Sequence, residues 1–355
     1  MKKIVTLIVS LVLIVSALFC SYIPTDYKAG KGSGENEEVK TIETLSEVIA
    51  DTCRLMSTQS NSSAQQTSSL PEKNMATLLS AESTENSLSA GTIPSYESVT
   101  VTADISEEFS CAFGENYSEY DYSFVYNGQM TVHIDSDGEM LISMRNMEIT
   151  MDFPSGSELG TRIYGNFDAD IYINDGVCAA KYYSFSLNGT AYKDILGKWI
   201  DVNSIENEFS SFFDTFKNFL TNWLMNVNVY ITNYRDEAFN QENEKFVMND
   251  EYLRKFILDQ FKIANNNFLG ASYDYIKSDA LSMEVDLSNR CSPTVTTDAK
   301  DVKYSTSVYM NADDSSPTEV VCQYSECLCL RFENINNTVI DFDESKIVDA
   351  NSLWR

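Results

Sequence analysis

Residues 122–142 read YSFVYNGQMTVHIDSDGEMLI, and this stretch decides the fold class. Apolar and aromatic side chains alternate with polar ones in short runs, which is the pattern of half-buried β-strands. Asn127-Gly128 separates two of these runs and accepts positive φ at both positions, so it predicts a tight hairpin turn. The segment from Asp135 to Gly138 predicts the next turn. Short strands joined by tight turns indicate an antiparallel sheet.

The alternating pattern extends in both directions along the chain. Strands are expected from Tyr96 to Val202 and again from Leu281, with the last ones at residues 319–324, 327–332 and 338–342. Between these two meanders the apolar spacing changes to three and four, which predicts one helix from about Ser204 to Leu224. A polar loop over residues 236–244 and a second helix over residues 249–265 follow. The sequence therefore predicts one α+β domain over residues 96–355.

Residues 21–95 are expected to form a helix and a linker ahead of this domain. Apolar residues recur every three or four positions over residues 35–56, which predicts an amphipathic helix. Residues 57–95 are rich in Ser, Thr, Asn and Gln, so they bury too little apolar surface to offset the entropy of ordering. We interpret this second stretch as a flexible linker.

The first 20 residues have the plan of a secretory signal. Lys2 and Lys3 precede an apolar run from Ile4 to Phe19, which predicts export from the cytosol. Small residues at Val15-Ser16-Ala17 favour ordinary cleavage and a secreted protein. Alternatively Cys20, at the end of the run, resembles the lipidated cysteine of bacterial lipoproteins and predicts a membrane-anchored protein. An uncleaved N-terminal anchor is the third reading of the same segment.

The net charge of the chain is −28, from 53 acidic and 25 basic residues. Such a chain repels phosphate backbones, so we expect no nucleic-acid partner. It also repels anionic membrane surfaces, so contact with a membrane is expected only through the N-terminus or a lipid anchor. An envelope protein remains a candidate partner.

The residues typical of catalytic and metal sites are scarce. His133 is the one histidine, and it lies in a predicted strand, so neither a triad nor a zinc site is expected. No cofactor and no enzymatic activity are predicted, although a hydrolase that uses two carboxylates stays open because acidic residues abound. Seven cysteines remain after Cys20, and the odd number leaves at least one thiol or an intermolecular bond. Cys327 and Cys329 share a strand face and could pair with each other or with Cys322.

Three segments carry a family resemblance. A strand containing Gly197-Lys198-Trp199 precedes an aromatic helix, and the run from Leu330 to Ile340 closes the domain. This order resembles the half-barrel lipoproteins related to the periplasmic lipoprotein carrier and to mycobacterial lipid-binding lipoproteins. The resemblance implies a strongly curved antiparallel sheet, a half-barrel, with two helices packed on its concave face.

The resemblance also implies a site, because in that family acyl chains lie between the helices and the sheet. Carried over to this chain, the lining consists of Trp199, Phe209, Phe212, Phe213, Phe216, Phe219, Leu220 and Trp223. A helical aromatic stripe is, however, more often simply the face that packs on the core. We therefore expect an exported, non-catalytic cell-envelope protein that binds a lipid or another apolar ligand, and the alternative is a surface adhesion or scaffold module.

Overall fold

The structure is a computed structural model that describes residues 37–58, 96–153, 162–174, 177–201, 208–264, 274–308 and 316–349. For residues 57, 58, 208–220, 222, 260–264 and 308 it describes the backbone only. The predicted signal segment with Cys20, and the predicted linker, lie outside the described residues. No helix in the described ranges is both long and apolar enough to span a bilayer.

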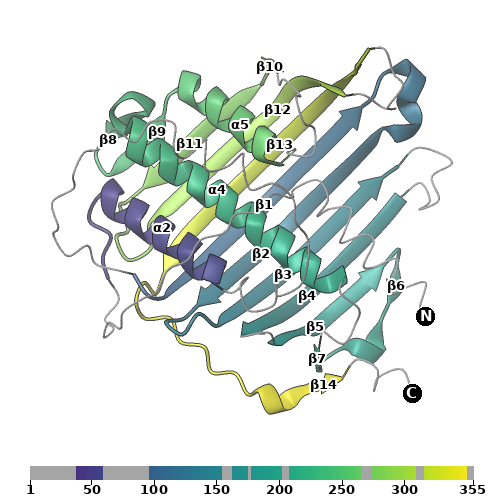
Figure 1. Cartoon of the computed structure of the whole chain (residues 1–355), viewed down its shortest axis with the longest axis vertical. Helices are drawn as coiled ribbons and strands as arrows, with labels where there is room; N and C mark the ends of the chain where they lie inside the picture. Colours follow the sequence, from purple (N-terminus) through teal and green to yellow (C-terminus); the bar gives the residue numbers. More distant parts are fainter. Residues whose placement is uncertain are drawn as a thin grey trace.

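The described residues form a first helix, a strand meander, two further helices separated by a short hairpin, and a second strand meander, in that order (Figure 1). The helices are α2 (Ile42–Thr58), α4 (Glu208–Ala238) and α5 (Asp250–Ala264), with three 3-10 turns, η1 (Glu115–Tyr120), η2 (Lys193–Ile195) and η3 (Glu344–Lys346). The strands of the first meander are β1 (Val99–Ala112), β2 (Tyr122–Ile134), β3 (Met140–Asp152), β4 (Arg162–Asn174), β5 (Val177–Leu187), β6 (Thr190–Ala191) and β7 (Trp199–Asp201). The later strands are β8 (Phe239–Glu242), β9 (Lys245–Met248), β10 (Asp274–Lys277), β11 (Ala280–Asp286), β12 (Thr294–Val308), β13 (Thr318–Glu333) and β14 (Ile347–Asp349).

All of these strands belong to one open, curved sheet. Its order is β14-β7-β5-β4-β3-β2-β1-β13-β12-β11-β9-β8, with β10 paired to β12 and β6 paired to β5. The pairs are antiparallel except for β14 with β7. The two meanders therefore meet at one central seam, between β1 and β13, where 13 residue pairs are in register from Thr100↔Glu333 to Ala112↔Val321. The predicted fold class, α+β with a large antiparallel sheet, is confirmed.

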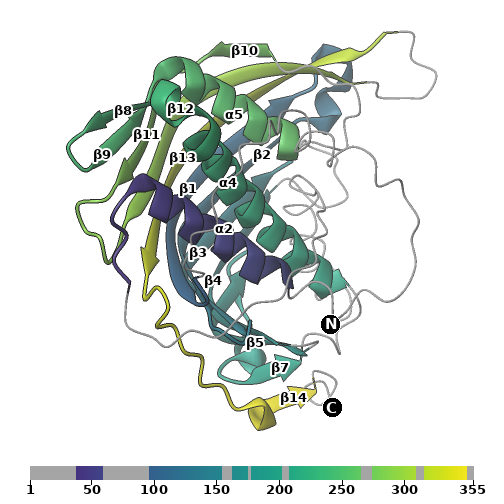
Figure 2. The same ribbon diagram turned by 60° about the vertical axis from the view of Figure 1, so that its left-hand side comes forward.

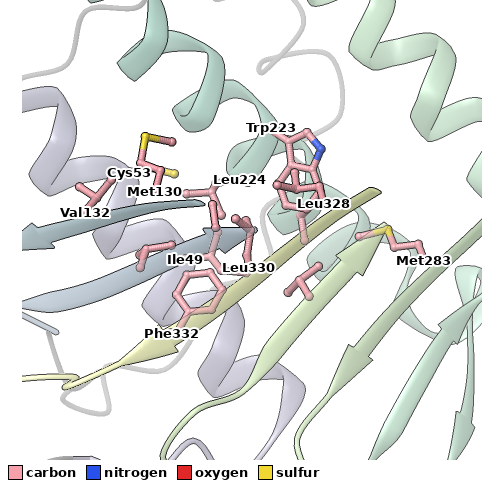
Figure 3. Close-up of a cluster of buried hydrophobic side chains, with 14 of the residues drawn as sticks. Ile49, Cys53, Met130, Val132, Trp223, Leu224, Met283, Leu328, Leu330 and Phe332 are labelled. Carbon is pink, nitrogen blue, oxygen red and sulfur yellow. The ribbon is translucent and has the colours of Figure 1, made fainter. Parts of the chain in front are cut away.

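The helices lie over one face of the sheet, and α2 runs beside α4 (Figures 1 and 2). Their buried side chains join those of the strands in a single hydrophobic cluster. Figure 3 shows part of it, with Ile49 of α2 and Leu224 of α4 facing Met130 of β2 and Leu330 of β13. Burial of apolar surface holds the helices to the sheet, and it contributes about 25 cal/mol of stability for each Å² removed from water.

Helix α2 starts later than its apolar spacing predicted. Thr41 caps it, because the Thr41 hydroxyl accepts a hydrogen bond from the backbone N–H of Thr44 at 3.2 Å. The residues before it bond to two loops instead, since the N–H groups of Glu37 and Val39 donate to the carbonyls of Ile335, just after β13, and Arg290, between β11 and β12. The stripe itself is buried as expected, so α2 packs into the same core as the domain that follows.

The predicted hairpin turn at Asn127-Gly128 is wrong. Strand β2 continues through both residues, and the register with β3 shifts between Asn127 and Gln129. The side chain of Met147 crosses Gly128, so the glycine is needed for close approach at a bulge rather than for a turn. The turn predicted at Asp135–Gly138 is present, and Gly138 has positive φ.

Replacing Gly128 with alanine is expected to lower the free energy of unfolding by about 1–3 kcal/mol. The new Cβ would overlap Sδ of Met147 and lie 3.1 Å from its Cα, so either strand β3 or the methionine must move. Gly165→Ala is the matched control, because its Cβ would meet its nearest neighbours at 3.7 Å. Urea unfolding of both variants measures the difference, and equal stabilities would remove the packing role assigned to Gly128.

Three other boundaries differ from the prediction. Helix α4 continues to Ala238, through the start of the expected polar loop, and the rest of that loop is the β8–β9 hairpin. Strand β13 is continuous where two strands were predicted, because Tyr324, Glu326 and Leu328 keep one alternation through the polar residues. Residues 338–342 are not a strand; the chain leaves the sheet there and returns as β14 beside β7.

Candidate functional site

The buried face of β1 carries a glutamate among apolar residues. Val101 and Ala103 face the core, and the same alternation continues through Glu107, Phe109 and Cys111. Glu107 is only 8% exposed. A strand that alternates strictly places residues of one parity on one face, so Glu107 shares the face that the helices cover.

A second buried glutamate lies directly opposite the first. Glu326 of β13 is the register partner of Glu107 and is 6% exposed. On the other side of Glu107, Tyr126 of β2 is its register partner. Tyr324, two residues before Glu326 on the same strand face, donates a hydrogen bond to Oε2 of Glu326. We refer to Glu107, Glu326, Tyr126 and Tyr324 as the acid–tyrosine cluster.

The surroundings of this cluster favour protonated carboxyl groups. Burial raises the pKa of Glu107 to about 8, and the neighbouring Glu326 adds to the rise. Burial also raises the pKa of Glu326 to about 7, and the hydrogen bond from Tyr324 counteracts part of that rise. The phenol of Tyr126 likewise has a raised pKa because it is buried and close to Glu107. Near neutral pH the pair therefore keeps at least one proton and can both donate and accept hydrogen bonds.

Two further buried polar groups lie on the same face of the sheet. Thr297 and Thr306 of β12 are buried, and neither hydroxyl has a hydrogen-bond partner within the described part of the chain. Thr297 is two residues before Ala299, which is the register partner of Glu326. A buried hydroxyl without a partner costs free energy, so the face is more polar than a core built for packing alone requires.

Of the residues predicted to line the site, the structure describes the side chains of two, Trp223 and Trp199. Trp223 is buried in the core, with its ring perpendicular to that of Phe256 of α5 at a centroid distance of 6.0 Å. Trp199 lies on β7, near one edge of the sheet, and its ring contacts Phe342 at 4.6 Å. The other six, Phe209, Phe212, Phe213, Phe216, Phe219 and Leu220, are on α4, but their side chains lie outside the described residues.

Sequence reasoning missed both glutamates, although the sequence holds a signal for each. Glu107 continues the alternation of Val99, Val101 and Ala103, and Glu326 has the parity of Leu328 and the residues after it. An acidic residue that continues the alternation of core-facing residues along a strand is expected to be buried. His133 lies in strand β2, where a strand was predicted, and its Nδ1 is 3.1 Å from Oγ1 of Thr100.

A separate hollow of about 570 Å³ opens at the far end of the central seam. Its lining comes from the end of β1, from η1 and from the start of β13, and includes Phe113, Tyr117 and Pro317. None of the cluster residues lines it. The hollow therefore does not give the buried glutamates an open approach for a bulky substrate.

Comparison with known proteins adds no assignment. No protein-family model matches the chain, and no curated protein matches its sequence.

Proposed function

We propose that this protein is an exported, non-catalytic cell-envelope protein that holds an amphipathic, lipid-like ligand between its sheet and its helices. In this proposal the curved sheet acts as a half-barrel with α4 and α5 on its concave face (Figure 2). The apolar part of the ligand lies along the aromatic stripe of α4. Its polar end, which carries hydroxyl, amide or amine hydrogens, meets the acid–tyrosine cluster. The N-terminal segment provides export, and Cys20 provides the lipid anchor.

The observation that carries the proposal is the pair Glu107 and Glu326, buried opposite one another on the core-facing side of the sheet. Burying two carboxyl groups opposite one another costs several kcal/mol, and well-packed apolar residues in their place are often neutral or stabilising. The pair therefore does not serve stability, and we assign it a role in recognising the polar end of the ligand. A ligand with donor hydrogens would hydrogen-bond to these carboxyl groups.

The two alternatives have less support. A docking module needs a contiguous apolar surface. The large apolar side chains exposed on the described residues lie on five different segments, namely Tyr120, Tyr183, Ile276, Val321 and Val339. A hydrolase with paired carboxylates needs an open cleft around them, whereas Glu107 and Glu326 are both less than 10% exposed.

Native mass spectrometry of the protein, produced with its N-terminal segment and extracted gently from membranes, tests this function. The wild-type protein is expected to carry a copurifying mass in the lipid range. The double variant Glu107→Leu/Glu326→Leu is expected to fold at least as stably, because it replaces two buried carboxyl groups with apolar side chains, yet to lose most of that ligand. Extraction of the bound material and its analysis would identify the polar end.

Glu108→Leu is the matched control, because Glu108 is the next residue on β1 but lies exposed on the opposite face. It is expected to retain the ligand fully. A bare wild-type mass after exposure to membranes would contradict the proposed function. If the double variant carried as much ligand as the wild-type protein, the cluster would not be part of the binding site. The ligand would then be held by apolar contacts alone.

A further inference from the structure

Two buried cysteines meet across the central seam of the sheet. Cys111 of β1 and Cys322 of β13 are register partners, and both face the core, at 7% and 3% exposure. Their sulfur atoms are 2.6 Å apart, and both are thiols in this structure. Directly opposed residues of an antiparallel pair have Cβ atoms about 4.5–5.5 Å apart, within a small adjustment of the spacing that a disulfide needs.

We propose that Cys111 and Cys322 form a cross-strand disulfide in the mature protein. The two thiols lose two protons and two electrons, and an Sγ–Sγ bond forms. The electrons pass to the disulfide of a dithiol oxidant, whose S–S bond breaks to give two thiols by thiol–disulfide exchange. The inference does not depend on ligand binding. It requires only an oxidising compartment, which export of the chain would supply.

The other described cysteines are placed unfavourably for pairing with these two. Cys327 and Cys329 lie on the opposite face of β13 from Cys322, so the pairing with Cys322 considered from the sequence is wrong. They are also two residues apart on one strand, so their Cα atoms are about 6.7 Å apart, at the upper limit of the separation that a disulfide spans. Cys178 lies on β5, and three strands, β4, β3 and β2, separate it from Cys111.

Two further cysteines lie elsewhere in the fold. Cys53 of α2 is buried and directs its sulfur to the carbonyl of Thr221 at 3.7 Å. Cys291 is exposed in the connection between β11 and β12. Among the seven described cysteines, only Cys111 and Cys322 therefore sit directly opposite one another across a strand pair.

The bond would join the two meanders. Cys111 and Cys322 are 211 residues apart in the sequence, and the β1–β13 seam is where the first meander adjoins the second. The rings of Tyr122 and Tyr304 flank the sulfurs as their register partners on β2 and β12. Because reduction requires a thiolate to reach one of the sulfurs, burial between two tyrosines makes the bond resistant to reductants in solution.

Peptide mapping of the full chain, isolated from the cell envelope without reductant and digested after alkylation in denaturant, tests the inference. One linked pair of peptides containing Cys111 and Cys322 is expected, and it should disappear after reduction. Cys111→Ser should make Cys322 open to alkylation. Cys327→Ser/Cys329→Ser is the control that should leave the linked pair unchanged.

The peptide map of the wild-type protein tests for the Cys111–Cys322 bond by itself, so the test does not depend on whether a variant folds. Complete alkylation of both cysteines, in the isolated protein and again after incubation with oxidised glutathione, would overturn the inference. So would a link from either cysteine to a different one. Neither result would bear on the ligand measured by native mass spectrometry, so failure of this inference and failure of the proposed function can be told apart.

Discussion

Raising the pH from about 5 to about 8 is expected to lower the free energy of unfolding by several kcal/mol, because of Glu107 and Glu326. In the unfolded chain both carboxyl groups have the ordinary pKa of 4.5, whereas burial raises the folded-state values to about 8 and about 7. Between these values the folded protein binds more protons than the unfolded one. Stability therefore falls with rising pH, by at most about 1.4 kcal/mol per pH unit for each carboxyl group.

The upper limit of this loss is about 8 kcal/mol, reached if both groups titrate independently. The contribution of Glu326 is complete near pH 7 and that of Glu107 near pH 8. The phenols that face the pair, Tyr126 and Tyr324, have pKa values raised by burial and stay neutral throughout this window. Urea unfolding at several pH values, with the slope of each transition compared, measures the effect.

Glu107→Gln/Glu326→Gln is the control for the pH effect. Without titrating groups at these positions the profile should become nearly flat over the same range, and Glu108→Gln on the exposed face should leave it unchanged. A wild-type stability that is constant or rises between about pH 5 and 8 would show that the two carboxyl groups are not buried as described.

The sequence predicts the sheet well because its signals are local. Alternation over a few residues assigns strand and face together, and Asp135–Gly138 carries its own turn chemistry. The failure at Asn127-Gly128 has a tertiary cause, since the role of that glycine depends on Met147 of the neighbouring strand. The extension of α4 past Leu224 has a similar origin, because Val227, Tyr230 and Ile231 are buried against other elements.

The candidate site could be predicted only in part. The parity of Glu107 within β1 is readable from the sequence, and so is that of Glu326 within β13. Their meeting is not readable, because it requires the first long strand to pair with the last long one. The same topology brings Cys111 to Cys322. The sequence shows which face of its own strand each residue occupies. Only the long-range strand pairing shows which residues of different strands become neighbours on that face.

Trp223→Ala is expected to lower the free energy of unfolding of the ligand-free protein by about 4 kcal/mol. Trp223 is 2% exposed, packs edge-on against Phe256 and lies beside Leu328 of β13 (Figure 3). Truncation removes a large apolar surface and leaves a cavity that its neighbours fill only partly. The sequence predicts this tryptophan in a ligand lining; in the structure it contacts Phe256 of α5 and lies beside Leu328 of β13, so it also supports α4 on the sheet.

Trp199→Ala is the matched control, because it makes the same truncation at a half-buried position near the sheet edge. Its loss is expected to be only about 1 kcal/mol, since the ring contacts Phe342 but is not enclosed by the core. Urea unfolding of both variants, stripped of lipid in detergent and returned to buffer, measures the difference. If Trp223→Ala kept wild-type stability and lost only the copurifying ligand, Trp223 would belong to the ligand lining, and the space between α4 and the sheet would be a binding cavity at that level rather than packed core.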